Sequence, residues 1–412
     1  MSARAGWSAA QIGYCSNVHP ARDVAGLRAS IQQHFQEVRR QRGLAVQDSG
    51  LWISAQAAAE LQDPEVREAF LELLHDSGLR LTSLNGFPYG QFHEGAVKAE
   101  VYRPTWAEPQ RLEYSLQLAH LLAAALPLDC QQGVISSVPL GYAATWNEAK
   151  QQQAEAHLRQ LTAELASLHR SSGKKILLCL EMEPDCVLEN TNQALAFFKR
   201  WQATDPHHSY LALCFDVCHQ AVVFEDCYQS LKRLLDAHIP VGKIQLSNAL
   251  ICQLPLADCQ RREQVLQALG NFVETTYLHQ VKARDVAGQM LAWSDLPGAL
   301  SAAEPTQGQC PELRIHFHVP LFSEQFLLSE LSGSQQALLR TFDFLAAYPH
   351  FQPVLEVETY SWNVLPAALR PDSEQALLQG IAAELQWVES QLHKRQLLRS
   401  LSSSMEAPAH AL

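Results

Sequence analysis

Nine short apolar runs recur along the chain, and longer segments with helical spacing lie between most of them. No other feature constrains the fold as strongly, because strands that alternate with helices are parallel strands joined by helical crossovers. We therefore predict an α/β protein. The nine runs are Ile12–Cys15, Leu51–Ser54, Leu79–Leu84, Val134–Val138, Ile176–Glu181, Leu211–Asp216, Ile244–Ser247, Leu313–His318 and Val354–Glu358.

Eight such repeats close into a (β/α)8 TIM barrel, which is the architecture we predict. There are nine candidate runs for the eight strands of a barrel. One of the last three therefore belongs to an insertion or is not a strand. The segment Leu250–Gln309 is the main candidate and is expected to form an elaborated loop over the barrel mouth. We expect a single domain over residues 1–400 and a flexible tail over residues 401–412. A doubly wound open sheet is the alternative, but no G-x-G-x-x-G motif follows the first run.

Helix signals between the runs support this alternation. Apolar residues from Ala154 to Leu168 fall on one helical face, and Gly173 follows as a C-terminal cap. Asn190 stands where the N-cap of another helix is expected. A final amphipathic helix is predicted over Glu374–Leu398.

The composition limits the cellular compartments and the binding partners that can be expected of this protein. The chain has 31 Lys and Arg against 43 Asp and Glu, a formal net charge of −12, and no basic run. Nucleic acid is therefore not an expected partner, because Lys and Arg supply the affinity for phosphates. The first 20 residues contain no apolar h-region of the kind that a signal peptide needs, and no apolar stretch reaches the roughly 18 residues of a membrane span, so we expect neither feature. The 10 cysteines form no C-x-x-C pair, so we expect a reduced, cytoplasmic protein.

Polar side chains follow most of the predicted strands, at the ends that face the active site of a barrel. Glu181, Asp216 and Glu358 end three separate runs, and their mutual repulsion in one mouth requires a cation. Oxygen and imidazole ligands suit a divalent ion such as Mn²⁺, Mg²⁺ or Zn²⁺. Further polar residues at strand ends include Asn17, His19, Asn85, Glu183, His219, Gln245, His316 and His318.

Taken singly, these residues have simpler explanations. Glu181 or Glu358 can cap the next helix or pair with a basic residue, and Asn85 fits turn chemistry. His316 and His318 share one face of their strand, which points either into the mouth or towards the helices. The joint occurrence of these residues at separate strand ends favours a site.

The motifs LEMEP, FDVCH, IQLSN and LEVETY resemble the metal-site series of the xylose-isomerase-like TIM barrels. That superfamily includes sugar isomerases, ketose 3-epimerases, hydroxypyruvate isomerase and endonuclease IV. The resemblance implies that Glu181, Asp216, Gln245 and Glu358 bind the metal. It also implies that His219 contacts the substrate.

Longer motifs are similar to those of the metabolite-traffic protein EboE family. They are GYCSNVHP, NGFPYGQFH, VKAEVYRPTW and LEVETYSWNVLP, and the likeness runs over roughly Ile12 to Pro366. It implies a xylose-isomerase-like barrel associated with the movement of a metabolite precursor. The chain departs from the enzyme pattern at Glu183, where xylose isomerase has a lysine, and at the HFHVP run, which the smaller epimerases lack.

A metal at this site would best support proton abstraction next to a carbonyl. We therefore expect an isomerase or epimerase of a sugar, cyclitol or related polyol that acts through an enediolate. Glu181, Glu358 and His219 are the expected catalytic residues, and His318 is expected to add a metal ligand. The residues expected to bind the substrate are His19, Asn85, Lys98 and His316.

Two other functions stay open. A binding protein with the same pocket would hold the polyol without turning it over. A metal-dependent phosphodiesterase similar to endonuclease IV would need a basic groove, which the net charge of −12 disfavours. A homo-oligomer formed through the helical shell is compatible with the sequence.

Overall fold

The computed structural model describes residues 6–90 and 97–399 of the chain. The predicted tail at 401–412 lies outside the described residues. Eight parallel strands form the main sheet, in the order β1-β14-β7-β6-β5-β4-β3-β2. They are β1 (Ile12–Tyr14), β2 (Gln47–Trp52), β3 (Leu79–Asn85), β4 (Gln132–Ser137), β5 (Lys175–Glu181), β6 (Leu211–Asp216), β7 (Val241–Leu246) and β14 (Val354–Val357).

The sheet curls into a barrel whose last seam lies between β1 and β2. A parallel bridge between Cys15 and Gly50 joins these two strands. Gly50 is required there, because a Cβ atom would overlap the carboxylate of Glu356. The (β/α)8 barrel predicted from the alternation of runs is therefore confirmed.

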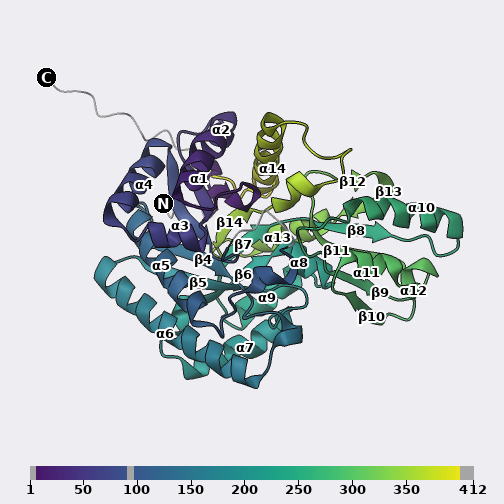
Figure 1. Ribbon diagram of the computed structural model, residues 1–412, viewed down its shortest axis with the longest axis horizontal. Helices are drawn as coiled ribbons and strands as arrows, with labels where there is room; N and C mark the ends of the chain where they lie inside the picture. Colours follow the sequence, from purple (N-terminus) through teal and green to yellow (C-terminus); the bar gives the residue numbers. More distant parts are fainter. Residues whose placement is uncertain (1–5, 91–96, 400–412) are drawn as a thin grey trace.

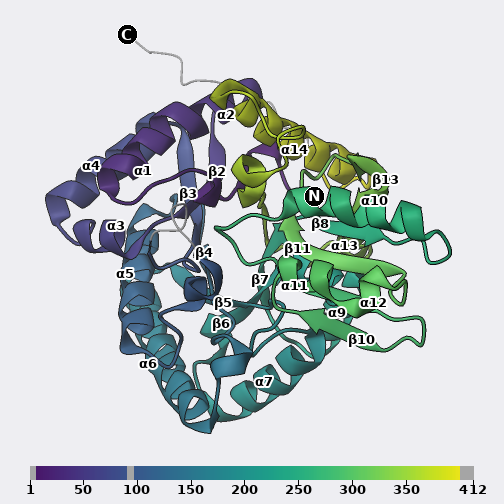
Figure 2. The same ribbon diagram turned by 45° about the vertical axis from the view of Figure 1, so that its right-hand side comes forward.

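Helices cover the outside of the barrel, as Figures 1 and 2 show most clearly for α5, α6 and α7. This shell buries the outer face of the apolar strands, as parallel sheets require. The helices are α1 (Val24–Ser30), α2 (Gln36–Gln41), α3 (Ala55–Glu60), α4 (Pro64–Asp76), α5 (Pro109–Ala125), α6 (Glu148–Ser172), α7 (Thr191–Thr204), α8 (Val217–Val222), α9 (Cys227–Asp236), α13 (Gln335–Ala347) and α14 (Glu374–Lys394). No helix in the described part of the chain is long and apolar enough to cross a membrane.

A second, antiparallel sheet interrupts the barrel between β7 and α13, in the order β10-β9-β11-β8-β13-β12. It forms a lobe beside the barrel, at the right of Figures 1 and 2. Its elements are β8 (Ala249–Gln253), α10 (Cys259–Leu269), β9 (Val281–Arg284), β10 (Met290–Trp293), α11 (Leu296–Ser301), α12 (Ala303–Thr306), β11 (Glu312–His318), β12 (Gln325–Phe326) and β13 (Leu328–Gly333).

The inserted sheet corrects one detail of the sequence prediction. The insertion does not end near residue 310 but continues to Gly333, and the run Leu313–His318 is β11 of the second sheet rather than a barrel strand. β11 pairs antiparallel with both β8 and β9. An apolar run of this length predicts a strand but does not indicate which sheet the strand joins.

The predicted helix ends are confirmed at α6 and α7. Gly173 ends α6 in the left-handed conformation with φ of 71°. Asn190 caps α7, where its side chain accepts a hydrogen bond from the Gln193 backbone N–H at 3.2 Å and the Gln193 side chain accepts from the Asn190 N–H at 3.2 Å. This reciprocal pair is a capping box.

Replacing Asn190 by alanine is expected to lower the free energy of unfolding by about 1 kcal/mol, because the Gln193 N–H loses its acceptor. Chemical denaturation monitored by circular dichroism measures the change. Asn190→Ser is the matched control, since serine preserves the cap, and it should stay close to the wild type. Equal stabilities for all three proteins would contradict the capping argument.

Candidate metal centre

A cavity opens at the carboxyl ends of the barrel strands, between the barrel and the second sheet. It spans about 530 Å³, counting the space at its opening. Phe87, Tyr102, Tyr277 and Tyr360 line its sides. Carboxylate, imidazole and amide side chains form its floor, so a small polar molecule would meet apolar walls and a polar floor.

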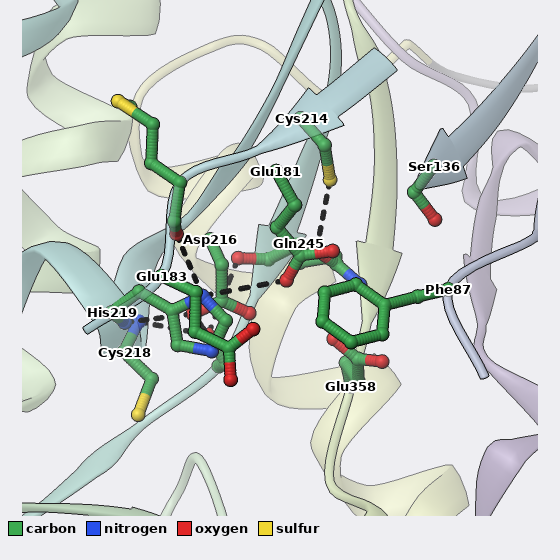
Figure 3. A network of polar contacts seen from close by, with 12 residues as sticks. Phe87, Ser136, Glu181, Glu183, Cys214, Asp216, Cys218, His219, Gln245 and Glu358 are labelled. Atoms are coloured by element: carbon green, nitrogen blue, oxygen red, sulfur yellow. Dashed lines mark hydrogen bonds and ion pairs between the residues drawn. The ribbon is translucent and has the colours of Figure 1, made fainter. Parts of the chain in front are cut away.

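Three carboxylates from three barrel strands converge at this floor. Glu181 ends β5, Asp216 ends β6 and Glu358 follows β14, and one carboxylate oxygen of each lies within 4.8 Å of the others. Figure 3 shows Glu181, Asp216 and Glu358 directed towards a common region. All three side chains are buried. Parallel strands bring their carboxyl ends to one rim, so the fold itself produces this convergence.

Asp216 is held in place by hydrogen bonds to one of its two oxygens. Its Oδ1 accepts from Ser247 Oγ at 2.7 Å and from the His219 backbone N–H at 2.9 Å. Its Oδ2 is buried and has no hydrogen-bond partner among the described residues. A buried carboxylate oxygen without a donor is costly, and a cation would satisfy it.

Glu358 is oriented by two amide groups. Asn17 Nδ2 donates to Glu358 Oε1 at 2.6 Å, and Asn85 Nδ2 donates to the same oxygen at 3.2 Å. Asn85 was expected to bind the substrate; it lines the cavity but also positions Glu358. The motif GYCSNVHP places Asn17 just after the first strand, among the polar residues at strand ends, but the sequence assigned it no role in the site.

Burial and mutual repulsion disfavour charge on these carboxyls. Burial raises the pKa of Glu181 well above its ordinary value, and the charges of Glu358 and Asp216 raise it further. Burial likewise raises the pKa of Glu358, together with the charge of Asp216. Such shifts indicate that positive charge is required before all three groups can ionise together. The donor set fits a divalent cation with a preference for oxygen ligands.

His318 offers a neutral nitrogen next to this cluster. Its Nδ1 lies 2.7 Å from the backbone oxygen of Glu358, which only accepts, so Nδ1 carries the ring proton. Its Nε2 is buried and has no hydrogen-bond partner within the described ranges. Burial lowers the pKa of His318 to about 4, so the lone pair stays available at neutral pH. One ligand atom each of Asp216, His219 and His318 lie within 4.8 Å of one another.

Gln245 does not present its oxygen to the cluster. It lies beside Asp216 in the β6–β7 register and is completely buried. Its Oε1 accepts from the Cys214 thiol at 2.8 Å, as Figure 3 shows. Its Nε2 has no partner in the described part of the chain. Metal ligation by Gln245 would require the amide to turn over, so this predicted ligand stays a prediction.

His219 and His316 meet at the other end of the floor. His219 Nε2 lies 3.0 Å from His316 Nε2, and His219 Nδ1 lies 3.4 Å from Glu181 Oε1. Glu183 lies next to this pair, and burial raises its pKa to about 7 although His219 lowers it. Residues two apart in an extended chain share a face. The motif LEMEP therefore indicates that Glu183 points into the cavity together with Glu181.

Two of the predicted substrate-binding residues are engaged elsewhere. His19 is not among the residues that line the cavity; its ring stacks on His34, 4.0 Å between centroids, and its Nε2 lies 3.1 Å from the Tyr14 hydroxyl. Lys98 reaches the rim, but its Nζ pairs with Asp295 at 2.8 Å and donates to the Tyr277 carbonyl at 2.7 Å. Lys98 thus ties the loop after β3 to the inserted lobe.

The affinity for a divalent cation such as Mn²⁺ is expected to rise with pH. Because the folded protein without metal holds protons on Glu181 and Glu358 above their ordinary pKa, binding must release protons. Affinity is therefore lost as the pH falls below these raised values, by up to about tenfold per pH unit for each proton released. Titration calorimetry between about pH 5.5 and pH 7.5, in two buffers of different ionisation enthalpy, measures both effects. A pH-independent affinity without proton release would contradict this assignment.

Comparisons with known proteins return similarity in solved structures only. No protein-family model and no curated protein matches the chain, so the resemblance to EboE is not confirmed. A D-allulose 3-epimerase from Methylomonas sp. is 11% identical with a TM-score of 0.49, covering 94% of this chain and 100% of that one.

Two further solved structures contain a bound metal. A xylose isomerase-like TIM barrel protein from Mycobacterium smegmatis in complex with magnesium is 14% identical, with a TM-score of 0.49, and the match covers 94% of this chain and 99% of that one. The IOLI protein with a bound zinc atom is 10% identical, with a TM-score of 0.45, over 93% of this chain and 97% of that one. At such low identity and TM-score these similarities assign no substrate or reaction to this chain.

Proposed function

We propose that the protein is a divalent-metal-dependent isomerase or epimerase of a sugar, cyclitol or related polyol. One observation carries the proposal: Glu181, Asp216 and Glu358, from three separate strands, place buried carboxylate oxygens within 4.8 Å of one another at the barrel mouth. Glu181, Asp216, Glu358 and His318 would hold the ion. When bound, it supplies positive charge to substrate oxygens that become negative in the reaction.

The protein's own groups would then transfer the proton. In this mechanism one of Glu181 and Glu358 removes a proton from the carbon next to the substrate carbonyl, and the other returns a proton to the neighbouring carbon or to the opposite face. Without metal, burial raises the pKa values of both carboxyls. A bound cation would lower them again towards the working pH, where an acid and a base both transfer protons efficiently. The aromatic walls would exclude water from the enediolate.

Solvent isotope exchange tests the proposal on a panel of compounds, so the substrate need not be identified first. The Mn²⁺-loaded protein is incubated in D₂O with ketoses, aldoses and oxidised cyclitols, and NMR detects deuterium at the carbon next to the carbonyl. We expect exchange that depends on the metal and is lost in the metal-stripped protein. If no member of the panel exchanges, the proposed reaction is wrong.

A binding role is the second candidate, and the sequence resemblance to the EboE family supports it. In that role the same pocket holds a polyol for transport or transfer without turnover. Calorimetric binding of a panel compound, with neither deuterium uptake nor a new product by mass spectrometry, would select this function.

A further inference from the structure

The ring nitrogens of His219 and His316 lie close enough for a single group to bind both of them. His219 comes from the start of α8 and His316 from β11 of the inserted sheet. Both side chains are buried, and their Nε2 atoms lie 3.0 Å apart. If both Nε2 atoms present lone pairs, a proton or a cation must lie between them.

Hydrogen bonds at the opposite nitrogens determine where the ring protons reside. His219 Nδ1 lies 2.9 Å from the Met182 backbone oxygen, which only accepts. His316 Nδ1 lies 2.7 Å from Gln280 Oε1. The Gln280 amide is oriented by its Nε2, which donates to the Pro184 carbonyl at 3.1 Å. Each Nδ1 is therefore a donor, and in a neutral ring each Nε2 presents a lone pair.

Glu183 supplies a third group directed at the same region. Its Oε1 accepts from the Tyr102 hydroxyl at 2.7 Å. Its Oε2 is buried and has no hydrogen-bond partner among the residues that the structure describes. One ligand atom each of Glu183, His219 and His316 lie within 4.8 Å of one another.

We propose that Glu183, His219 and His316 form a second divalent-metal site, distinct from the carboxylate centre. A single cation accepts both imidazole lone pairs and the orphaned carboxylate oxygen at once. A proton shared by the two rings would relieve only the nitrogens and would leave Glu183 Oε2 unsatisfied. Two nitrogens that bind one ion at about 2.1 Å are about 3.0 to 3.4 Å apart, close to the separation found here.

The ligand chemistry indicates the class of metal. Two imidazoles and one carboxylate favour a borderline transition ion such as Zn²⁺, Co²⁺ or Fe²⁺, whereas the carboxylate centre suits Mn²⁺ or Mg²⁺. Three protein ligands leave coordination positions open towards the cavity. This site gives His219 and His316 a metal-binding role in place of the expected substrate contacts. It does not rest on the proposed isomerase reaction.

Cobalt titration of the metal-stripped full-length protein tests the second site. Bound Co²⁺ is counted by elemental analysis after gel filtration, and its visible absorption reports nitrogen ligation. We expect two ions per chain in the wild type and one in Glu183→Gln and in His316→Ala. Glu358→Gln, which alters only the carboxylate centre, should keep the ion that His219 and His316 bind. His157→Ala, which removes a buried histidine of α6, is the matched control and should keep both ions.

Circular dichroism of each variant establishes whether it is folded. If His316→Ala does not fold, the isosteric Glu183→Gln still tests the second site. One ion at most in the wild type would overturn the second site. So would two ions in both folded variants, or ¹⁵N NMR of the cobalt-free, zinc-saturated protein that still shows a proton between His219 and His316. Failure of the isotope-exchange experiment would leave these stoichiometries unaffected, so the two proposals fail separately.

Discussion

Replacing Glu358 by glutamine is expected to slow turnover by about 10²- to 10⁴-fold, the usual contribution of one acid–base group. Glutamine retains the shape of the side chain and an oxygen that can accept from Asn17 and Asn85, so the fold should persist. It cannot take up or release a proton. The rate is measured by deuterium exchange on the substrate that the wild type accepts, at saturating Mn²⁺.

Metal occupancy must be measured alongside the rate, because Glu358 is also a candidate ligand. A fall in turnover at full occupancy isolates the proton-transfer role, whereas a fall that excess Mn²⁺ restores indicates ligation only. Glu384→Gln is the matched control. Glu384 of α14 is also buried, but its carboxylate accepts hydrogen bonds from the side chains of Thr359 and Trp362 and does not line the cavity. Unchanged turnover of metal-replete Glu358→Gln would rule out the acid–base mechanism.

Replacing Lys243 by methionine is expected to cost about 3 to 5 kcal/mol of unfolding free energy. Lys243 Nζ lies 2.5 Å from Glu356 Oε1, and both side chains are at most 1% exposed. Burial lowers the pKa of Lys243, but the charge of Glu356, together with those of Cys214, Cys15 and Glu358, outweighs this and leaves the pKa raised. Methionine fills a similar volume and leaves the Glu356 carboxylate buried without its cation.

Guanidinium denaturation of the metal-free protein measures this cost. The double variant Lys243→Met with Glu356→Gln should regain most of the loss, because it removes both charges. The exposed pair Lys232–Asp236 is the control, and Lys232→Met should cost no more than about 1 kcal/mol. If Lys243→Met and Lys232→Met lose equal stability, the buried ion pair stabilises the protein no more than the exposed one does, and the prediction is wrong.

The barrel and its carboxylates were predictable because they depend on local patterns. The run KILLCLE is apolar along its length and ends in Glu181, and a parallel strand of this kind places that residue at the mouth whatever the neighbouring strands are. Asp216 and Glu358 follow from the same rule.

Contacts between distant segments were not predictable from single runs. Lys98 has the sequence context of a loop charge, and only the folded lobe brings Asp295 to it. His19 follows the first strand as expected, but the chain turns its ring towards His34. The strand that carries His316 and His318 contributes to the cavity from the second sheet, which no periodicity distinguishes from a barrel strand.

The position of β14 determines when the barrel can be completed. β14 pairs with β1, so Leu355 meets Ile12 only after the whole intervening chain, including the inserted lobe, has left the ribosome. Such a distant pairing makes the final closure slow. Because Glu358 arrives with β14, an ion bound to all three carboxylates would stabilise the closed ring and none of the partly synthesised forms that precede it.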